Sequence, residues 1–148
     1  MSILELVAAF EMGSLGQKEF ESALEQQMQS CQRRQEDLQR QRVPVEDQAL
    51  WEQELRPGLD ACYDGLIGAA AEALEFARSR NQDLLVGIAG LLQEVDRIGA
   101  YLEARAGLVS TATRQRLREG LAAPADGLAL GGANQGSAES QVAFLEEN

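Results

Sequence analysis

Pairs of acidic residues three or four positions apart are the side chains in this sequence best suited to chemistry. Three pairs have this spacing: Asp60 with Asp64, Glu21 with Glu25, and Glu72 with Glu75. On a helix, both carboxylates of a pair lie on one face, where they could serve as a general acid and base or bind a metal ion. Such pairs are also ordinary on the exposed face of an acidic helical protein. We therefore expect no catalytic residue, no metal site and no enzyme activity.

The rest of the sequence excludes most familiar catalytic machinery. The chain contains no histidine, which removes Ser-His-Asp and Cys-His catalysis, histidine-bound zinc and the Glu-x-x-His di-iron pattern. Its two cysteines, Cys31 and Cys62, form no CxxC motif and fall in apolar helical rows. We interpret them as buried thiols, with the alternative that they face each other across a helix pair. The glycine-rich stretch at 131–136 lacks the Lys-Ser/Thr of a P-loop, so we expect no cofactor.

Charge and composition narrow the choice of partners and compartment. The 148 residues include 24 acidic and 13 basic side chains, which give a net charge of −11. This balance disfavours nucleic-acid binding and adhesion to an anionic membrane. No apolar stretch reaches the length of a membrane span, and the short run from Ile3 to Phe10 lacks the basic residues of a secretory signal. We expect a cytoplasmic protein, and the preference for arginine over lysine favours a bacterial source.

The segment from Trp51 to Ala106 organises the rest of the chain, because it contains two apolar rows at helical spacing. The first row is Leu55, Leu59, Cys62, Leu66, Ala69, Ala73 and Phe76. The second row is Tyr63, Ile67, Ala70, Leu74, Ala77, Leu84, Ile88, Leu91, Val95, Ile98 and Leu102. Steps of three and four residues predict helices that pack against other helices.

A run of six polar residues, from Arg78 to Asp83, leaves two interpretations of this segment open. The second apolar row keeps its phase across the run with Asn81 in a core position, as in one long coiled-coil helix. Asn81 followed by Asp83 is also a good helix start, and a helix of about fifty residues is rare in a small domain. We favour a turn at Ser79–Gln82 and an antiparallel hairpin, with Asn81 as a cap.

Local signals place the remaining helices. Ser2 and Glu5 form a capping box for an apolar helix at 2–12, which is expected to pack on its own bundle or else to dock on another subunit. Residues 16–41 predict a second helix whose latter half is nearly polar all round. A third helix spans 45–78 with a break or kink near Pro57, and the last core helix spans 82–105. Trp51 is expected to close one end of the core.

The predicted fold is all-α: a small antiparallel bundle of three long helices and a short N-terminal helix, with a flexible C-terminal tail. We expect the bundle to cover residues 1–106 and a possible short helix at 107–123 to end at Pro124. In that segment Arg114, Arg116 and Arg118 are expected to pair with the acidic surface of the bundle. Residues 124–148 are expected to form a flexible acidic tail.

The two apolar rows make a face wider than one neighbouring helix needs, which indicates a role in helix–helix contact. We expect a non-enzymatic adaptor or assembly protein that acts as a homodimer or with a larger protein partner. The residues expected to make the contacts are Leu55, Leu59, Tyr63, Leu66, Ile67, Leu74, Ile3, Leu6 and Phe10. The alternative is a small acidic chaperone or immunity-like protein that masks a secreted partner. An enzyme that uses helix carboxylates is a third possibility.

Overall fold

A computed structural model describes the backbone of residues 2–128 and the side chains of residues 2–122. This part of the chain contains helices and no strand. The α-helices are α1 (Ile3–Glu11), α2 (Gln17–Arg40), α3 (Gln48–Leu50), α4 (Arg56–Ser79), α5 (Asp83–Ala104) and α6 (Thr111–Leu128). Two 3₁₀ turns, η1 (Val45–Asp47) and η3 (Ala106–Leu108), and a π-helical segment, η2 (Trp51–Leu55), join them.

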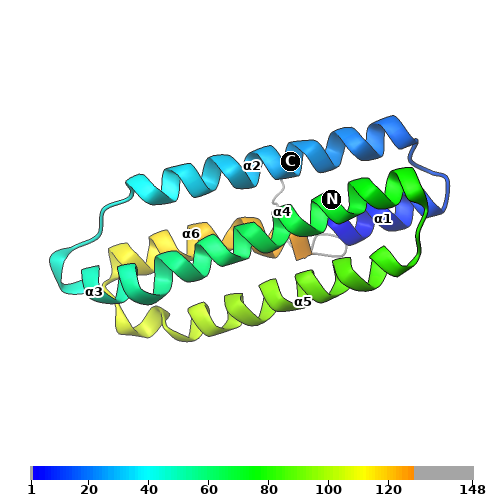
Figure 1. The fold of residues 1–148 in the computed structure, drawn as a ribbon. Helices are drawn as coiled ribbons and strands as arrows, with labels where there is room; N and C mark the ends of the chain where they lie inside the picture. The colour runs from blue at the N-terminus through cyan, green and yellow to red at the C-terminus, as the bar shows by residue number, and fades with distance from the viewer. Residues whose placement is uncertain (1, 129–148) are drawn as a thin grey trace.

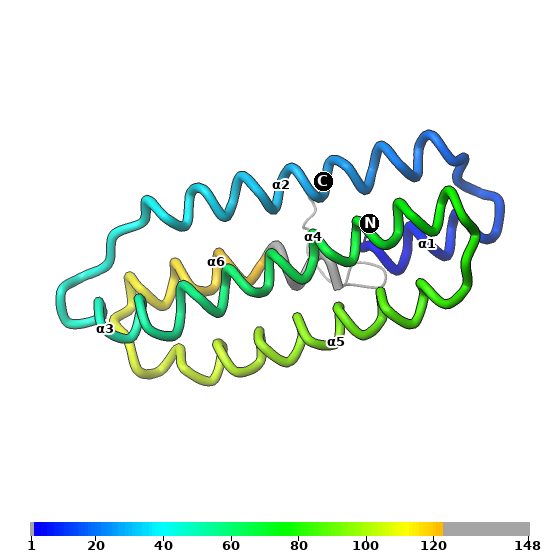
Figure 2. Tube along the Cα trace, viewed as in Figure 1, coloured from blue at the N-terminus to red at the C-terminus, as the bar shows by residue number. Residues whose placement is uncertain are grey.

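Helix α4 is the centre of the bundle. Helices α2 and α5 run beside α4 along the whole length of the bundle, as Figures 1 and 2 show. Helices α1 and α6 lie one after the other along the remaining side. All four of these neighbours contact α4. The predicted all-α bundle is confirmed, and the two apolar rows are explained because α4 is surrounded by helices of its own chain.

The turn between α4 and α5 settles the choice between a hairpin and one long helix. Arg80 adopts the left-handed conformation, with φ 55° and ψ 26°, which ends α4. The Asn81 side-chain oxygen then accepts a hydrogen bond from the Asp83 N–H at 3.0 Å, and so satisfies one of the free N–H groups at the start of α5, whose N-cap residue is Gln82. The hairpin prediction is confirmed, and the alternative of one continuous helix is wrong.

Helix α1 packs on its own bundle, as expected. The Ser2 and Glu5 capping box is present, with hydrogen bonds of 2.8 and 3.1 Å. The Phe10 ring stacks on Phe20 at a centroid distance of 4.4 Å and meets the edge of Phe76 at 6.2 Å. Such aromatic pairs add directional stabilisation to the burial of apolar area.

The break expected near Pro57 takes the form of a wide helical turn. Residues Trp51–Leu55 are π-helical, and the Arg56 N–H donates to the carbonyl of Trp51 five residues earlier. Proline has no N–H to donate in a regular turn, so a local change of hydrogen-bond spacing just before Pro57 accommodates it. The chain therefore stays helical from Gln48 to Ser79. Trp51 is 1% exposed and belongs to the core.

Helix α6 contradicts the expected stop at Pro124, because it continues to Leu128. In a regular helix the Gly120 carbonyl would accept the N–H of residue 124, which proline lacks. The Tyr63 hydroxyl donates to this carbonyl at 2.7 Å instead. A tertiary contact thus compensates for the bond that proline removes, and residues 125–128 are helical rather than linker. The rest of the expected tail, residues 129–148, lies outside the described residues.

The N-terminus of α6 is held by a buried carboxylate. Asp47, 4% exposed, accepts hydrogen bonds from the Ser110 hydroxyl at 2.6 Å and the Thr113 hydroxyl at 2.5 Å. Its two oxygens also lie 3.3 Å from the Ser110 backbone N–H. A negative charge at this position is favoured by the unpaired N–H groups of the helix start. These hydrogen bonds hold the pKa of Asp47 below its usual value.

Two glycines on α4 let α5 approach closely. A Cβ atom at Gly58 would lie 2.6 Å from a methyl carbon of Leu102, and one at Gly65 would overlap the side chain of Val95. No side chain larger than hydrogen fits at either position unless Leu102 or Val95 of α5 moves. In residues 2–128, none of the helices has the length and apolar character needed to cross a membrane.

Candidate protein-interaction groove

The residues expected to contact a partner lie mainly in the core of the single chain. Seven of them are buried: Ile3, Leu6, Phe10, Leu55, Leu59, Tyr63 and Leu66. Ile67 and Leu74 are partly buried and pack against the same core. Helices of the same chain cover these side chains in this conformation, so the accessible interaction surface consists of other residues.

Large apolar side chains on the described surface are few. They are Met12, Val45, Val86, Tyr101 and Leu108. Tyr101, which is 48% exposed, donates a hydrogen bond to Glu54 at 2.7 Å and is covered by the guanidinium of Arg105. Single exposed apolar residues are normal on a protein surface. They do not by themselves define a binding site.

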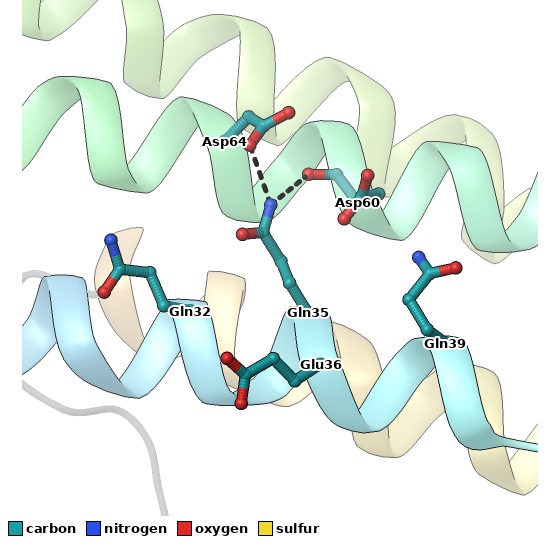
Figure 3. A pocket seen from close by; sticks show the side chains of 6 residues that line it. All are labelled: Gln32, Gln35, Glu36, Gln39, Asp60 and Asp64. Atoms are coloured by element: carbon teal, nitrogen blue, oxygen red, sulfur yellow. Dashed lines mark hydrogen bonds between the residues drawn. The ribbon is translucent and has the colours of Figure 1, made fainter.

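One concave feature of the described surface is a groove between the second half of α2 and the first half of α4. It is open to solvent and has a volume of about 470 Å³. Figure 3 shows the six lining residues, Gln32, Gln35, Glu36, Gln39, Asp60 and Asp64. The polar latter half of α2, noted in the sequence, forms one wall of this groove.

Gln35 fixes the two walls relative to each other. Its amide Nε2 donates to Asp64 Oδ1 at 2.7 Å and to the backbone carbonyl of Asp60 at 3.3 Å. Gln32 and Gln39 lie about one turn to either side on α2, and Figure 3 shows their amide groups on the side that faces α4. Their amides form no hydrogen bond with the described side chains or backbone. They are therefore free to bind an incoming polar group.

The groove carries concentrated negative charge. Glu36, Asp60 and Asp64 contribute three carboxylates, and none of them forms an ion pair within the described residues. The described residues also contain no group of three or more acidic or cysteine side chains placed to hold a metal ion. The arrangement suits a cationic side chain that donates several hydrogen bonds to these carboxylates, such as arginine or lysine.

The other sequence-predicted candidates lie apart from the groove. Glu21 accepts a hydrogen bond from Gln17 one turn earlier on α2, at 3.1 Å, and Glu72 lies beside Gly87 on α5. Of the three acidic pairs, the structure brings only Asp60 and Asp64 into the groove lining. The glutamines of α2 that face Asp60 and Asp64 could not be predicted from the sequence. Which of them faces α4 depends on how α2 and α4 are aligned along their lengths.

The arginines of α6 were expected to pair with acidic residues on the surface of the bundle, and only one of them does so within the described residues. Arg118 forms an ion pair with Glu103 of α5 at 3.1 Å. Arg114 instead donates to the backbone carbonyls of Ala106 and Val109, at 2.8 and 3.0 Å. No ion pair of Arg116 occurs within the described residues.

The two cysteines are buried free thiols, as expected. Burial raises the pKa of Cys62 to about 11 and raises that of Cys31 as well. The Cys62 thiol faces the backbone carbonyl of Val95 at 3.8 Å. Both thiols stay protonated near neutral pH, which makes them poor nucleophiles.

Fold and groove together define a helical bundle with a polar, acidic surface hollow. No protein-family model, no curated protein and no solved structure matches the chain.

Proposed function

We propose that this protein is a non-enzymatic helical adaptor that binds another protein through the groove between α2 and α4. The observation that supports it is the groove itself, in which three carboxylates and two unbonded amides gather on two helices. Its ligand is a basic segment, helical or extended, that places an arginine or lysine between Asp60 and Glu36. Charged hydrogen bonds of this kind give orientation and specificity as well as affinity.

The chemistry of the groove favours a protein ligand over a small substrate. The hollow is open and polar, whereas small-molecule sites are usually enclosed and largely apolar. The groove also contains no histidine or reactive thiol, because the chain has no histidine and both cysteines are buried elsewhere. The partner is a second copy of the chain or a different protein, and light scattering on the purified protein separates these two cases.

A charge-matched capture experiment tests the proposal. The double variant Asp60→Asn, Asp64→Asn removes two charges from the groove and keeps the side-chain shapes. The control, Glu21→Gln with Glu25→Gln, removes two charges from the first half of α2. We expect the wild-type protein and the control to retain the same partner from the native host, and the groove variant to retain at least tenfold less.

Equal capture by the groove variant would refute the proposed site. Mass spectrometry of the captured material also separates the related roles, since a dedicated chaperone would retain one dominant client. If no protein is retained, a thermal-shift series with divalent cations and small metabolites tests the enzyme alternative on the same carboxylates.

A further inference from the structure

Helix α6 lies directly over residues of α4 that the sequence predicts as a contact surface. A Cβ atom at Gly120 would lie 3.0 Å from one methyl group of Leu59 and 3.5 Å from the Tyr63 hydroxyl. The same hydroxyl donates to the Gly120 carbonyl. The α6 backbone thus rests on Leu59 and Tyr63 without an intervening side chain.

The contacts that hold residues 111–122 of α6 in place are mostly polar. Within its described side chains, Leu117 is fully buried and Leu121 is partly buried. The other attachments are hydrogen bonds and one ion pair: Asp47 with Ser110 and Thr113, Tyr63 with Gly120, and Glu103 with Arg118. Water can take the place of each partner when the helix moves away, so only part of the strength of each bond opposes that movement.

Helix α1 provides a useful contrast within the same side of the bundle. Its nine residues bury Ile3, Leu6, Val7 and Phe10, whereas residues 111–122 of α6, whose side chains the structure describes, bury Leu117 fully and Leu121 in part. This part of α6 is therefore held by fewer buried apolar side chains than α1. Regions with few buried apolar contacts open at lower free energy than the rest of a fold.

We propose that α6 is a displaceable strap, and that the surface of α4 beneath it binds a basic amphipathic helix of a partner protein. The contacts of α6 specify the occupant. The partner helix needs a small residue over Leu59 and Tyr63, where α6 has Gly120, and a leucine one turn earlier, where α6 has Leu117. It also needs an arginine opposite Glu103, and its N-terminus must lie at Asp47. The negative charges of Asp47 and Glu103 complement such a helix. This inference rests on the proposed adaptor role but uses a different surface from the groove.

A synthetic peptide serves as the probe for the uncovered surface. The peptide has the sequence of residues 111–128 and a fluorescent label, and its binding to the full-length protein is followed by fluorescence anisotropy. The protein variant Leu117→Ala weakens the strap in cis, while the peptide keeps its leucine. We expect this variant to bind the peptide at least tenfold more tightly than wild type does. A peptide with the same Leu117→Ala change is the matched control and is expected to bind weakly.

Hydrogen exchange on the wild-type chain gives an independent measurement that needs no variant. We expect the amides of α6 to exchange at least tenfold faster than those in the middle of α4. The strap is refuted if α6 and α4 exchange at the same rate, or if the peptide fails to bind Leu117→Ala while α4 and α5 stay protected. If added peptide converts a dimer of the protein to monomers, the occupant is α6 of a second copy, and assignment to a partner helix is overturned. The groove variant Asp60→Asn, Asp64→Asn should change neither measurement, so the two proposals can fail separately.

Discussion

The Tyr63 hydroxyl permits a direct test of why α6 continues through Pro124. It is the group that donates to the Gly120 carbonyl, at 2.7 Å, where proline leaves the usual helical donor absent. Replacing Tyr63 by Phe removes this donor and preserves the ring, which is 2% exposed. The Gly120 carbonyl is partly buried. A carbonyl that loses its partner inside a protein costs about 1–3 kcal/mol, so we expect the free energy of unfolding to fall by about 1.5 kcal/mol.

A second substitution restores the missing donor from the backbone. Pro124→Ala returns an N–H group that can donate to the Gly120 carbonyl in the regular helical pattern. In that background the loss of the Tyr63 hydroxyl should cost only about 0.5 kcal/mol, because the carbonyl keeps a partner. The expected coupling between the two substitutions is therefore about 1 kcal/mol, which a double-mutant cycle resolves.

Urea denaturation at neutral pH, followed by far-UV circular dichroism and by Trp51 fluorescence, measures the four free energies of the cycle. Tyr101→Phe is the control, because it removes an exposed hydrogen bond to Glu54 and should change stability by less than about 0.5 kcal/mol. Additive effects of Tyr63→Phe and Pro124→Ala, within about 0.3 kcal/mol, would show that the hydroxyl does not replace the absent N–H.

Three further predictions follow from groups already described. The lowered pKa of Asp47 means that its stabilisation is present above the pKa of the unfolded chain, about 3.9, and is lost as the pH falls through the folded value. The free energy of unfolding should therefore fall less steeply with decreasing pH below pH 4 in Asp47→Asn than in wild type. Identical pH dependence of the two proteins would contradict this. Gly65→Ala should destabilise the protein by about 1–2 kcal/mol, because a Cβ atom there would clash with Val95 of α5. Gly90 faces open space, so Gly90→Ala should stabilise the protein by about 0.5–1 kcal/mol through the higher helix propensity of alanine. Thermal unfolding measures both changes. Cys31 and Cys62 should react with a thiol reagent at neutral pH only at the rate of unfolding, and fast labelling of the native protein would contradict their burial.

Much of the architecture followed from the sequence because apolar periodicity is a local signal. The rows through Leu59 and Leu102 placed the end of α4 and both ends of α5 to within one residue. The choice of a hairpin was also local, since Asn81 and Asp83 form their hydrogen bond irrespective of what packs around them. Local patterns of this kind predict the same helices whatever the arrangement of the rest of the fold, provided that the apolar rows are buried.

The features that sequence reasoning missed all depend on contacts between distant residues. The stop expected at Pro124 fails because Tyr63, far earlier in the chain, supplies a donor to α6. The groove exists because Gln35 meets Asp64 across two helices, and one glutamine among many on α2 gives no hint of that register. The predicted contact residues were chosen for being apolar, but apolar periodicity cannot distinguish a helix covered by its own chain from one covered by a partner.

The division of one side of the bundle between α1 and α6 has a consequence for the order in which the protein folds. The hairpin of α4 and α5 joins neighbours in the chain, so it can form early with little loss of chain entropy. Phe10, by contrast, must find Phe76 across nearly half of the chain, and α6 can dock only after α4 is in place. We therefore expect that side to be completed late in folding, at a rate limited by the closure of long loops rather than by the formation of the helices themselves.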